Sequence, residues 1–352
     1  MYILTSVNNT LKYHLPAQVF AYGLSIRKRA IVRRFMGNVK VRFARRGKAI
    51  PTGSTVLLWG SAEPPSTMSP TMKIIRLEDG FLRSVGLGAD LVHPISWVMD
   101  GRGIYYDATH PSDLEYLLAT SEFNEAMLKR ASTLRERIVE AGLTKYNVGA
   151  GYWQRPAVAK RIILVPGQVE SDASIKFGAH GIRTNLGLLQ AVREANPQAF
   201  IIYKPHPDVV AGLRKQGVGE DDSAKWCDQV VVDFPMADLL KEIDEVHVLT
   251  SLTGFEALMR DKKVVCYGHP FYAGWGLTED QLPIDRRLRK LSLDALVAAT
   301  LILYPTYVSL KNATAITPEQ ALDELLELRD KANKSATLWR KFLRFFLRQR
   351  AY

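Results

Sequence analysis

The segment Tyr203–Asp208 (YKPHPD) combines residue types that can hold a phosphate group. The apolar run before it predicts a buried strand, so Lys204 is expected to project from the end of a sheet. His206 precedes a proline at the first position of the next predicted helix, where proline is favoured. A phosphate is favoured where cations and free backbone N–H groups meet at the start of a helix, so we predict that Lys204 and His206 bind a phosphate. The alternative is a surface turn without a ligand.

A second segment of this kind is Thr250–Leu258 (TSLTGFEAL), which links a predicted strand to a predicted helix. Its hydroxyl groups and free backbone amides converge where a phosphate could rest, and Gly254 allows a close approach of the backbone. Glu256 is expected either to accept hydrogen bonds from ribose hydroxyls or to complement the helix dipole. Helix capping alone is the alternative. The predicted nucleotide-binding residues here are Thr250, Ser251, Thr253, Gly254 and Glu256.

Carboxylates follow another buried strand, in Val165–Ile175 (VPGQVESDASI). Glu170 and Asp172 lie in a predicted loop, where a carboxylate can act as a nucleophile or as an acid–base catalyst. Retaining sugar transfer needs one carboxylate at the anomeric carbon and a second group that moves the proton. Gln168, which opens the loop, is predicted to contact the nucleotide. The alternative is a turn whose Asp and Ser cap the following segment.

Two further segments are candidates for substrate contact. In Arg76–Leu91, Glu78 is a candidate acid–base partner, and Asp79 and Arg83 are expected to face the substrate. An arginine there could bind a carboxylate or phosphate with two hydrogen bonds. In His269–Gly276 (HPFYAGWG), Tyr272 and Trp275 are expected to line a base or sugar, the alternative being a packed loop.

The elements that must position these residues alternate between short apolar strands and amphipathic helices, which is typical of α/β proteins. The chemically active segments follow predicted strands, and a parallel sheet would gather them at one edge. We therefore expect domains at residues 1–150 and 151–315 and C-terminal helices at 316–352. Strands are expected at 17–23, 39–44, 55–60, 72–77, 161–167, 199–206, 229–233, 245–251 and 263–270, and helices at 27–36, 111–120, 123–142, 185–195, 207–215, 236–242, 253–260 and 316–331.

The net charge of +11 is concentrated at the two ends of the 352-residue chain. Residues 1–50 contain eleven Lys or Arg and residues 331–352 contain seven, and neither stretch has an acidic residue. The ending SATLWRKFLRFFLRQRAY would place aromatic residues on one side of a helix and cations on the other, which is the pattern of a helix lying on a membrane surface. A solvated basic face is the alternative. No nucleic-acid-binding motif accompanies the charge, so no nucleic-acid partner is expected.

Several motifs are missing from the sequence. It has no Asp-X-Asp pair, which disfavours a metal-clamped diphosphate donor, and no P-loop. It also shows no signal-peptide pattern and no apolar run long enough to span a bilayer. We therefore expect no metal, no cofactor and a cytoplasmic location.

The strings LVPGQVESDASI, IIYKPHPDV, TSLTGFEAL and YGHPFYAGWGLTED resemble the KpsC-type capsule polysaccharide proteins, retaining transferases of β-Kdo (3-deoxy-D-manno-oct-2-ulosonic acid). The resemblance covers most of residues 70–310. It implies a metal-independent glycosyltransferase of the GT-B kind, with two Rossmann-like domains facing a central cleft and CMP-Kdo bound mainly by the second. KpsC-type proteins commonly contain two such modules, whereas this chain has one.

The resemblance also implies roles for single residues. The family often has Glu-Asp-Asp-Ala-Ser where this chain has Glu170-Ser171-Asp172-Ala173-Ser174, which leaves Asp172 as the candidate nucleophile. Glu78 would assist proton transfer from the acceptor hydroxyl, and the phosphate-binding residues would hold the departing CMP. The acceptor is expected to be a lipid-linked glycan at the inner face of the inner membrane, and other capsule assembly proteins are expected as further partners. The alternatives are a transferase for another CMP-sugar, of the sialyltransferase type, and a non-catalytic component of capsule export.

Overall fold

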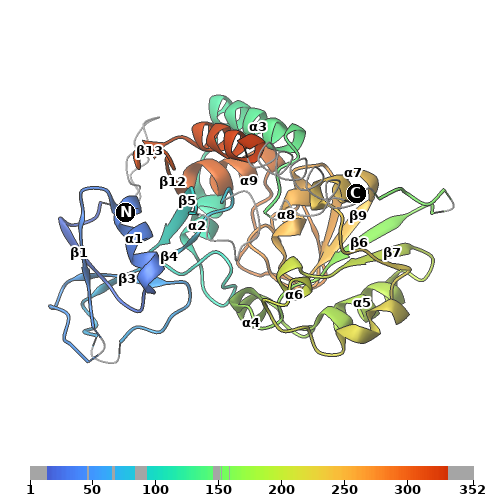
Figure 1. Ribbon diagram of the computed structural model, residues 1–352, viewed down its shortest axis with the longest axis horizontal. Helices are drawn as coiled ribbons and strands as arrows, with labels where there is room; N and C mark the ends of the chain where they lie inside the picture. The colour runs from blue at the N-terminus through green and yellow to red at the C-terminus, as the bar shows by residue number, and fades with distance from the viewer. Residues whose placement is uncertain are drawn as a thin grey trace, which may run out of the picture.

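The computed structural model describes residues 14–45, 47–65, 68–83, 93–145, 151, 153–157 and 159–331. Its strands form one sheet of seven and one of six, and helices lie against both (Figure 1). The first sheet is drawn in blue to teal, except for its two strands from the end of the chain, which are orange to red. The second sheet is drawn in green to orange and lies beside the first. The predicted α/β class is confirmed, and we call the two sheets with their helices the first and second units.

The first sheet is mixed. Its first four strands in the chain run parallel to one another, whereas the fifth strand, Ser96–Asp100, pairs antiparallel with both of its neighbours. The interior strand with the sequence TVLLW is almost wholly buried, while the edge strand KVRF alternates between exposed and half-buried residues. These patterns match a strand covered on both faces and an edge strand protected by charge. The order is β13 (Ala315–Ile316), β12 (Pro305–Val308), β5 (Ser96–Asp100), β4 (Lys73–Asp79), β3 (Thr55–Trp59), β1 (Gln18–Ala21), β2 (Lys40–Phe43).

The second sheet is parallel throughout, as the sequence predicted. Numbered along the chain, its strands have the order 3-2-1-4-5-6 of the doubly wound fold. The order reverses between the first and fourth strands, and ligands in such folds bind outside the strand ends at that point. Across the sheet the strands are β11 (Glu279–Asp280), β10 (Lys263–Cys266), β9 (Glu245–Val248), β6 (Ile162–Pro166), β7 (Phe200–Lys204) and β8 (Gln229–Val230).

The helices mostly begin at side chains that cap them. Ser112 and Asn124, for example, each accept a hydrogen bond from the backbone N–H three residues later. The helix predicted for 207–215 is shorter than expected, because Gly212 adopts a left-handed conformation (φ 70°). The helices are α1 (Ile26–Met36), α2 (Asp113–Thr120), α3 (Glu125–Glu140), α4 (Ala173–Gly178), α5 (Asn185–Ala195), α6 (Pro207–Val210), η1 (Glu220–Lys225), α7 (Met236–Glu242), α8 (Leu252–Leu258), α9 (Leu293–Val297), η2 (Ala298–Leu303) and one over residues 318–331.

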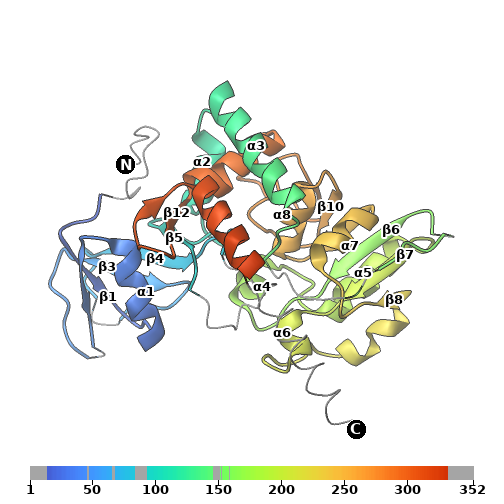
Figure 2. The same cartoon turned by 45° about the horizontal axis from the view of Figure 1, so that its top comes forward.

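The chain returns to the first sheet near its end. Strand β12 pairs antiparallel with β5, with Tyr307 opposite Ser96. This pairing lies before residue 315, where we expected the second domain to end. The helix over 318–331 then lies beside α3, between the two sheets in the view of Figure 2. Arg130 of α3 binds Glu319 through two hydrogen bonds of 2.7 and 2.9 Å.

The two units share a hydrophobic core. Its largest cluster joins Phe81 and Leu117 of the first unit to Leu164 and Val264 of the second. This continuity fixes the relative position of the loops that follow the two sets of strands.

A buried ion pair also joins the units. Glu115 of α2 accepts hydrogen bonds from Arg287 at 2.9 Å and from Arg286 at 3.1 Å. Arg287 is 6% exposed and also donates to the carbonyl oxygens of Pro270 (2.6 Å) and Ala273 (2.8 Å). The Glu115 carboxylate therefore holds the loop after β10 through this arginine.

We expect Glu115→Gln to lower the free energy of unfolding by about 3 kcal/mol or more, because it leaves a buried guanidinium without its counter-charge. Chemical unfolding followed by circular dichroism measures this change. Asp238→Asn is the matched control, since the pair Lys241–Asp238 has side chains 61% and 53% exposed, and its loss should cost about 1 kcal/mol at most. Equal effects of the two substitutions would contradict a structural role for Glu115.

Within the described ranges, no helix combines the length and apolar character needed to cross a bilayer. The predicted amphipathic helix at the end of the chain, residues 335–352, lies outside the described residues.

Candidate active site

A cavity of about 460 Å³ lies between the two units. It opens at the carboxyl ends of the second sheet, where the strand order reverses between β6 and β9. Gln168 follows β6 and Thr250 follows β9, and the two bind each other. The side-chain N–H of Gln168 donates to the Thr250 hydroxyl at 3.0 Å, and the Thr250 backbone N–H donates to the side-chain oxygen (Oε1) of Gln168 at 2.9 Å. This pair fixes both loops at the position where doubly wound sheets bind ligands.

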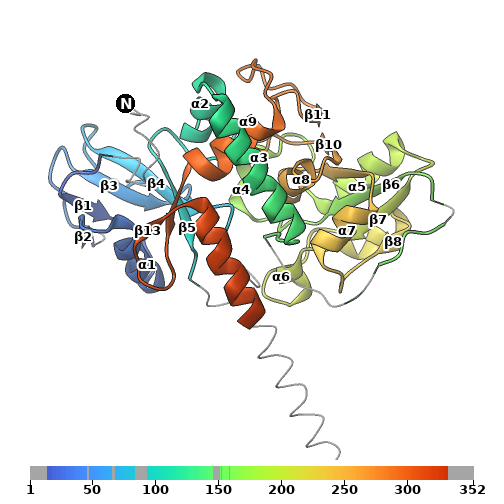
Figure 3. The same cartoon turned by 90° about the horizontal axis from the view of Figure 1, so that it is seen from above.

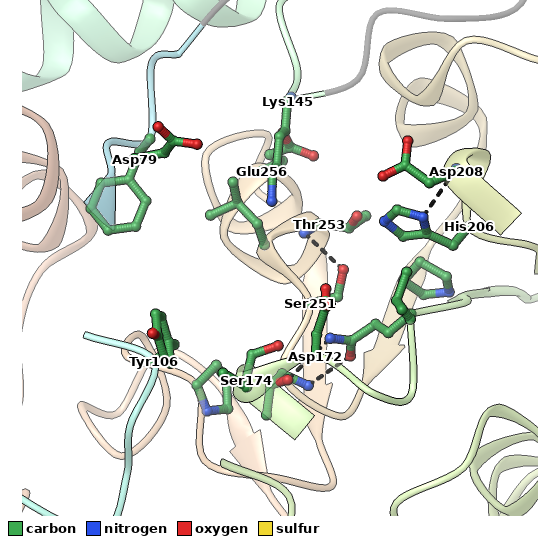
Figure 4. Close-up of a pocket in the computed structure, with 18 of the residues that line it drawn as sticks. Asp79, Tyr106, Lys145, Asp172, Ser174, His206, Asp208, Ser251, Thr253 and Glu256 are labelled. Carbon is green, nitrogen blue, oxygen red and sulfur yellow. Dashed lines mark hydrogen bonds between the residues drawn. The ribbon is translucent and has the colours of Figure 1, made fainter. Parts of the chain in front are cut away.

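The structure brings most of the predicted site residues together around this cavity. Figure 4 shows Asp79 and Tyr106 on one side, His206 and Asp208 on the other, and Lys145 pointing into the space between them. The predicted residues that line the cavity are Glu78, Asp79, Arg83, Gln168, Asp172, Lys204, His206, Thr250, Ser251, Thr253 and Glu256.

Lys204 and His206 form part of the second-unit wall. The Lys204 ammonium donates to the carbonyl oxygen of Val232 at 2.8 Å, and burial lowers its pKa to about 8. It therefore remains mostly charged at neutral pH. Burial and the nearby Lys145 lower the pKa of His206 to about 4, so this ring is neutral. Its Nδ1 accepts the backbone N–H of Asp208 at 3.2 Å, which places the ring proton on Nε2 as a hydrogen-bond donor.

Asp172 precedes the first residue of α4 and lines the same cavity. Its carboxylate pairs with the guanidinium of Arg214, and the two side chains are 44% and 43% exposed. The carboxylate is thus held in one position while remaining accessible. A positioned, accessible carboxylate in a cavity that is also lined by cationic side chains is suited to nucleophilic attack on a carbon atom that bears an anionic leaving group.

The opposite wall, from the first unit, contributes two adjacent carboxyl groups, Glu78 and Asp79. Burial and the neighbouring Asp79 carboxylate raise the pKa of Glu78 to about 7. Its carboxylate accepts the Asp79 backbone N–H at 3.0 Å, and Asp79 in turn binds Arg83 at 2.7 Å and the Trp97 indole at 3.2 Å. A carboxyl group that titrates near neutral pH at a cavity wall suits general acid–base catalysis.

Glu256 is the second carboxyl group whose pKa is raised to about 7, again by burial. It accepts the backbone N–H of Lys145 at 2.6 Å. This bond ties α8 to the segment between the units and orients Lys145, whose side chain enters the cavity (Figure 4).

The other predicted residues lie outside the lining and support it. Tyr272 and Trp275 are fully buried, so the prediction that they contact substrate is corrected. Tyr272 donates to the Ser251 carbonyl oxygen, and Trp275 donates to that of Phe271 at 2.9 Å. Gly254 faces the Tyr272 side chain, whose hydroxyl oxygen a Cβ would meet at 2.2 Å, so the absence of a side chain here serves packing. Glu170 accepts the backbone N–H groups of Asn185 (2.8 Å) and Val218 (2.9 Å) instead of facing the cavity.

Several lining residues were not among the predicted site residues, among them Trp59, Tyr106, Lys145 and Arg214. Arg214 could have been predicted if the helix had been ended at Gly212, because the chain there turns back toward Asp172. Trp59 ends a predicted strand, a position that itself suggests a ligand contact. Tyr106 and Lys145 lie in connections with no sequence signal, and only the packing of the two units brings them to the site.

A family model for the capsule polysaccharide biosynthesis protein matches residues 54–309. The capsule polysaccharide modification protein LipA of Neisseria meningitidis serogroup A is 44% identical over 322 residues, which are 89% of this chain and 46% of LipA. The lipopolysaccharide-processing protein LpsZ of Rhizobium meliloti is 40% identical over 306 residues, 82% of this chain and 70% of LpsZ. The chain thus spans about half the length of LipA.

Two solved structures of Thermosulfurimonas dismutans KpsC are also similar. The β-Kdo 2,7-transferase has a TM-score of 0.74 and 44% sequence identity, with 89% of this chain and 99% of that chain covered. The β-Kdo 2,4-transferase has a TM-score of 0.74 and 32% identity, with 89% and 98% covered.

Proposed function

Because the chain belongs to the capsule polysaccharide biosynthesis protein family, we propose that it is a retaining glycosyltransferase that moves Kdo from CMP-Kdo to a lipid-linked acceptor. The acceptor would be a growing capsule or related surface polysaccharide. The observation that carries this proposal is the single cavity in which Asp172, Lys204, His206 and Glu78 meet. Two α/β units with a cavity between them also support a GT-B-like arrangement.

The donor would lie against the second unit. Lys204 supplies a charge and neutral His206 supplies an N–H donor, so both can bind the CMP phosphate. The Ser251 and Thr253 side chains line the same space. These groups stabilise the negative charge that develops on the phosphate as the bond to Kdo breaks.

The transfer proceeds by two displacements. In the first, a carboxylate oxygen of Asp172 forms a bond to C2 of Kdo as the bond from C2 to the phosphate oxygen breaks and CMP leaves. In the second, the acceptor hydroxyl oxygen bonds to C2, its proton moves to Glu78, and the Asp172 carboxylate is released. Each displacement inverts C2, so the β configuration is retained.

The acceptor would reach Glu78 from the first unit's side of the cavity. An acceptor bound to lipid requires the enzyme to work at a membrane surface, for which we propose the cytoplasmic face of the inner membrane. The basic residues at the ends of the chain support this location, because cations are attracted to anionic lipids. The absence of an Asp-X-Asp motif from the sequence supports a transfer without metal or cofactor. Other capsule assembly proteins are proposed partners.

The direct test is an assay of the purified chain with CMP-Kdo and a synthetic lipid-linked acceptor. We expect a Kdo-extended product whose new linkage is β by NMR, formed at the same rate with and without EDTA. An inverted linkage, or transfer from another CMP-sugar in preference, would identify a different CMP-sugar transferase. Failure to bind CMP in a calorimetric titration would instead favour a non-catalytic role in capsule export.

A further inference from the structure

The segment 207–218, which contains α6, exposes large aliphatic side chains beside the cavity. Val210, Leu213 and Val218, which we call the aliphatic patch, are 50%, 52% and 75% exposed. Arg214 and Lys215, in the same segment, are exposed as well. Single exposed aliphatic residues are common, but several in one short segment mark an interaction surface.

The segment holds these side chains outward on a fixed backbone. Its own carbonyl groups bind its N–H groups, with Ala211 donating to Pro207 at 2.9 Å and Leu213 donating to Asp208 at 2.8 Å. Glu170 fixes the other end through the Val218 backbone N–H. Backbone groups that are already paired can enter the boundary between headgroups and acyl chains at little cost.

The same segment also forms part of the cavity, since Pro207, Asp208 and Arg214 line it. Whatever covers the aliphatic patch therefore lies next to the cavity.

Helix α1 lies at the same edge of the molecule. In Figure 3, α1, α6 and the end of the helix over 318–331 all lie along the lower edge. The exposed residues of α1 include Arg27, Arg33 and Ile26, and Ile26 is 85% exposed. In the sequence, no acidic residue occurs before Glu63. This edge thus combines exposed aliphatic groups with positive charge.

We propose that the edge formed by α1 and segment 207–218 docks on an anionic lipid bilayer, with the cavity opening toward the membrane. The aliphatic patch enters the headgroup boundary, while Arg27, Arg33 and Lys215 lie over lipid phosphates. Interleaved aliphatic and cationic side chains match such a surface in both polarity and charge. The inference rests on the proposed function, because a lipid-linked acceptor would then reach the cavity without leaving the bilayer.

Sedimentation of the full chain with vesicles tests this proposal. One vesicle preparation contains phosphatidylglycerol and phosphatidylcholine in equal parts, and the other contains phosphatidylcholine alone. We expect binding to the first and much weaker binding to the second. The triple variant Val210→Ser, Leu213→Ser, Val218→Ser should lower the affinity for anionic vesicles about tenfold or more, as should the double variant Arg27→Glu, Arg33→Glu.

Matched controls come from other surfaces. Leu288→Ser removes a leucine that is 86% exposed, from the connection between β11 and α9. Lys129→Glu reverses an exposed charge on α3. Neither should change vesicle binding, because Figure 3 places β11 at the opposite edge and α3 away from the lower edge.

The assay contains neither donor nor acceptor, so its outcome is independent of the transferase proposal. Transfer to a soluble acceptor analogue should be unchanged in the triple variant. Vesicle affinities equal to wild type in both variants would overturn the docking proposal and leave the transferase proposal intact. The docking proposal would also be overturned if the wild-type protein were a dimer and the triple variant a monomer, because the aliphatic patch would then be an interface between two copies. Vesicle binding without any Kdo transfer would overturn the transferase proposal alone.

Discussion

Asp172→Asn should abolish Kdo transfer, with a loss on the order of 10⁴-fold or more, because removal of a covalent nucleophile can cost about 10⁶-fold in rate. The amide retains the shape of the side chain but cannot form the ester with C2 of Kdo. The carboxylate is well placed for this role, since Arg214 fixes it while 44% of the side chain stays exposed. Product formation from CMP-Kdo measures the loss. Mass spectrometry of wild-type protein incubated with donor alone should also show an added Kdo unit on the peptide that contains Asp172.

Asp208→Asn is the matched control for this prediction. It removes the same charge from the same cavity, at a residue to which the mechanism gives no covalent role. We expect its rate to stay within about tenfold of wild type, because it contributes at most to the electrostatic environment. Normal transfer by Asp172→Asn, or an unchanged Kdo adduct in that variant, would show that another group is the nucleophile.

The second unit could be predicted closely from the sequence because its strands are continuous apolar runs. Such runs are typical of parallel sheets covered by helices on both faces, and all five predicted strands are present. Only β11, with the polar sequence Glu279–Asp280, was missed. It pairs with Val265 and Cys266 at the sheet's edge, and no periodic pattern marks it.

The first unit was less predictable because its sheet depends on distant pairing. Strand β12 joins β5 from the far end of the chain, so neither local propensity nor spacing indicates its partner. For the same reason, the return of the chain to the first sheet before residue 315 could not be read from the sequence.

The candidate site likewise contains residues that the local sequence indicates and residues whose position depends on tertiary packing. Residues that directly follow strands, such as Gln168, Lys204 and Thr250, could be located in advance because parallel strands end at one edge. Tyr272 was misassigned because an aromatic side chain near a glycine can either line a ligand or fill the space above that glycine. Only the coordinates show that it packs on Gly254. Lys145 was missed because its position depends on a backbone hydrogen bond to Glu256.

Glu78→Gln should lower the rate of transfer to the acceptor by about 10²- to 10⁴-fold, the usual contribution of a general base. It should also change the pH dependence. In the proposed mechanism Glu78 accepts the acceptor's proton and must be ionised, and its pKa is raised to about 7 by burial and by Asp79. The wild-type kcat/KM for the acceptor should therefore rise with pH through about 7, and this rise should disappear in the variant.

Glu256→Gln tests whether the pH dependence comes from Glu78 or from Glu256, whose pKa is also raised to about 7. The glutamine can still accept the Lys145 N–H through its amide oxygen, so the fold should be preserved and the pH-dependent rise in rate should remain.

The stability of the Glu78→Gln variant gives a second measurement, which does not depend on turnover. The pKa of Glu78 in the folded protein exceeds its unfolded value of about 4.3. The favourable contribution of Glu78 to the free energy of unfolding is therefore complete below pH ~4.3 and is lost as the pH rises through about 7. Thermal unfolding should accordingly show Glu78→Gln gaining stability relative to wild type across that range. If the rise in rate persists in Glu78→Gln and vanishes in Glu256→Gln, the general base is Glu256, and the acceptor hydroxyl must then lie against α8 rather than against the first unit.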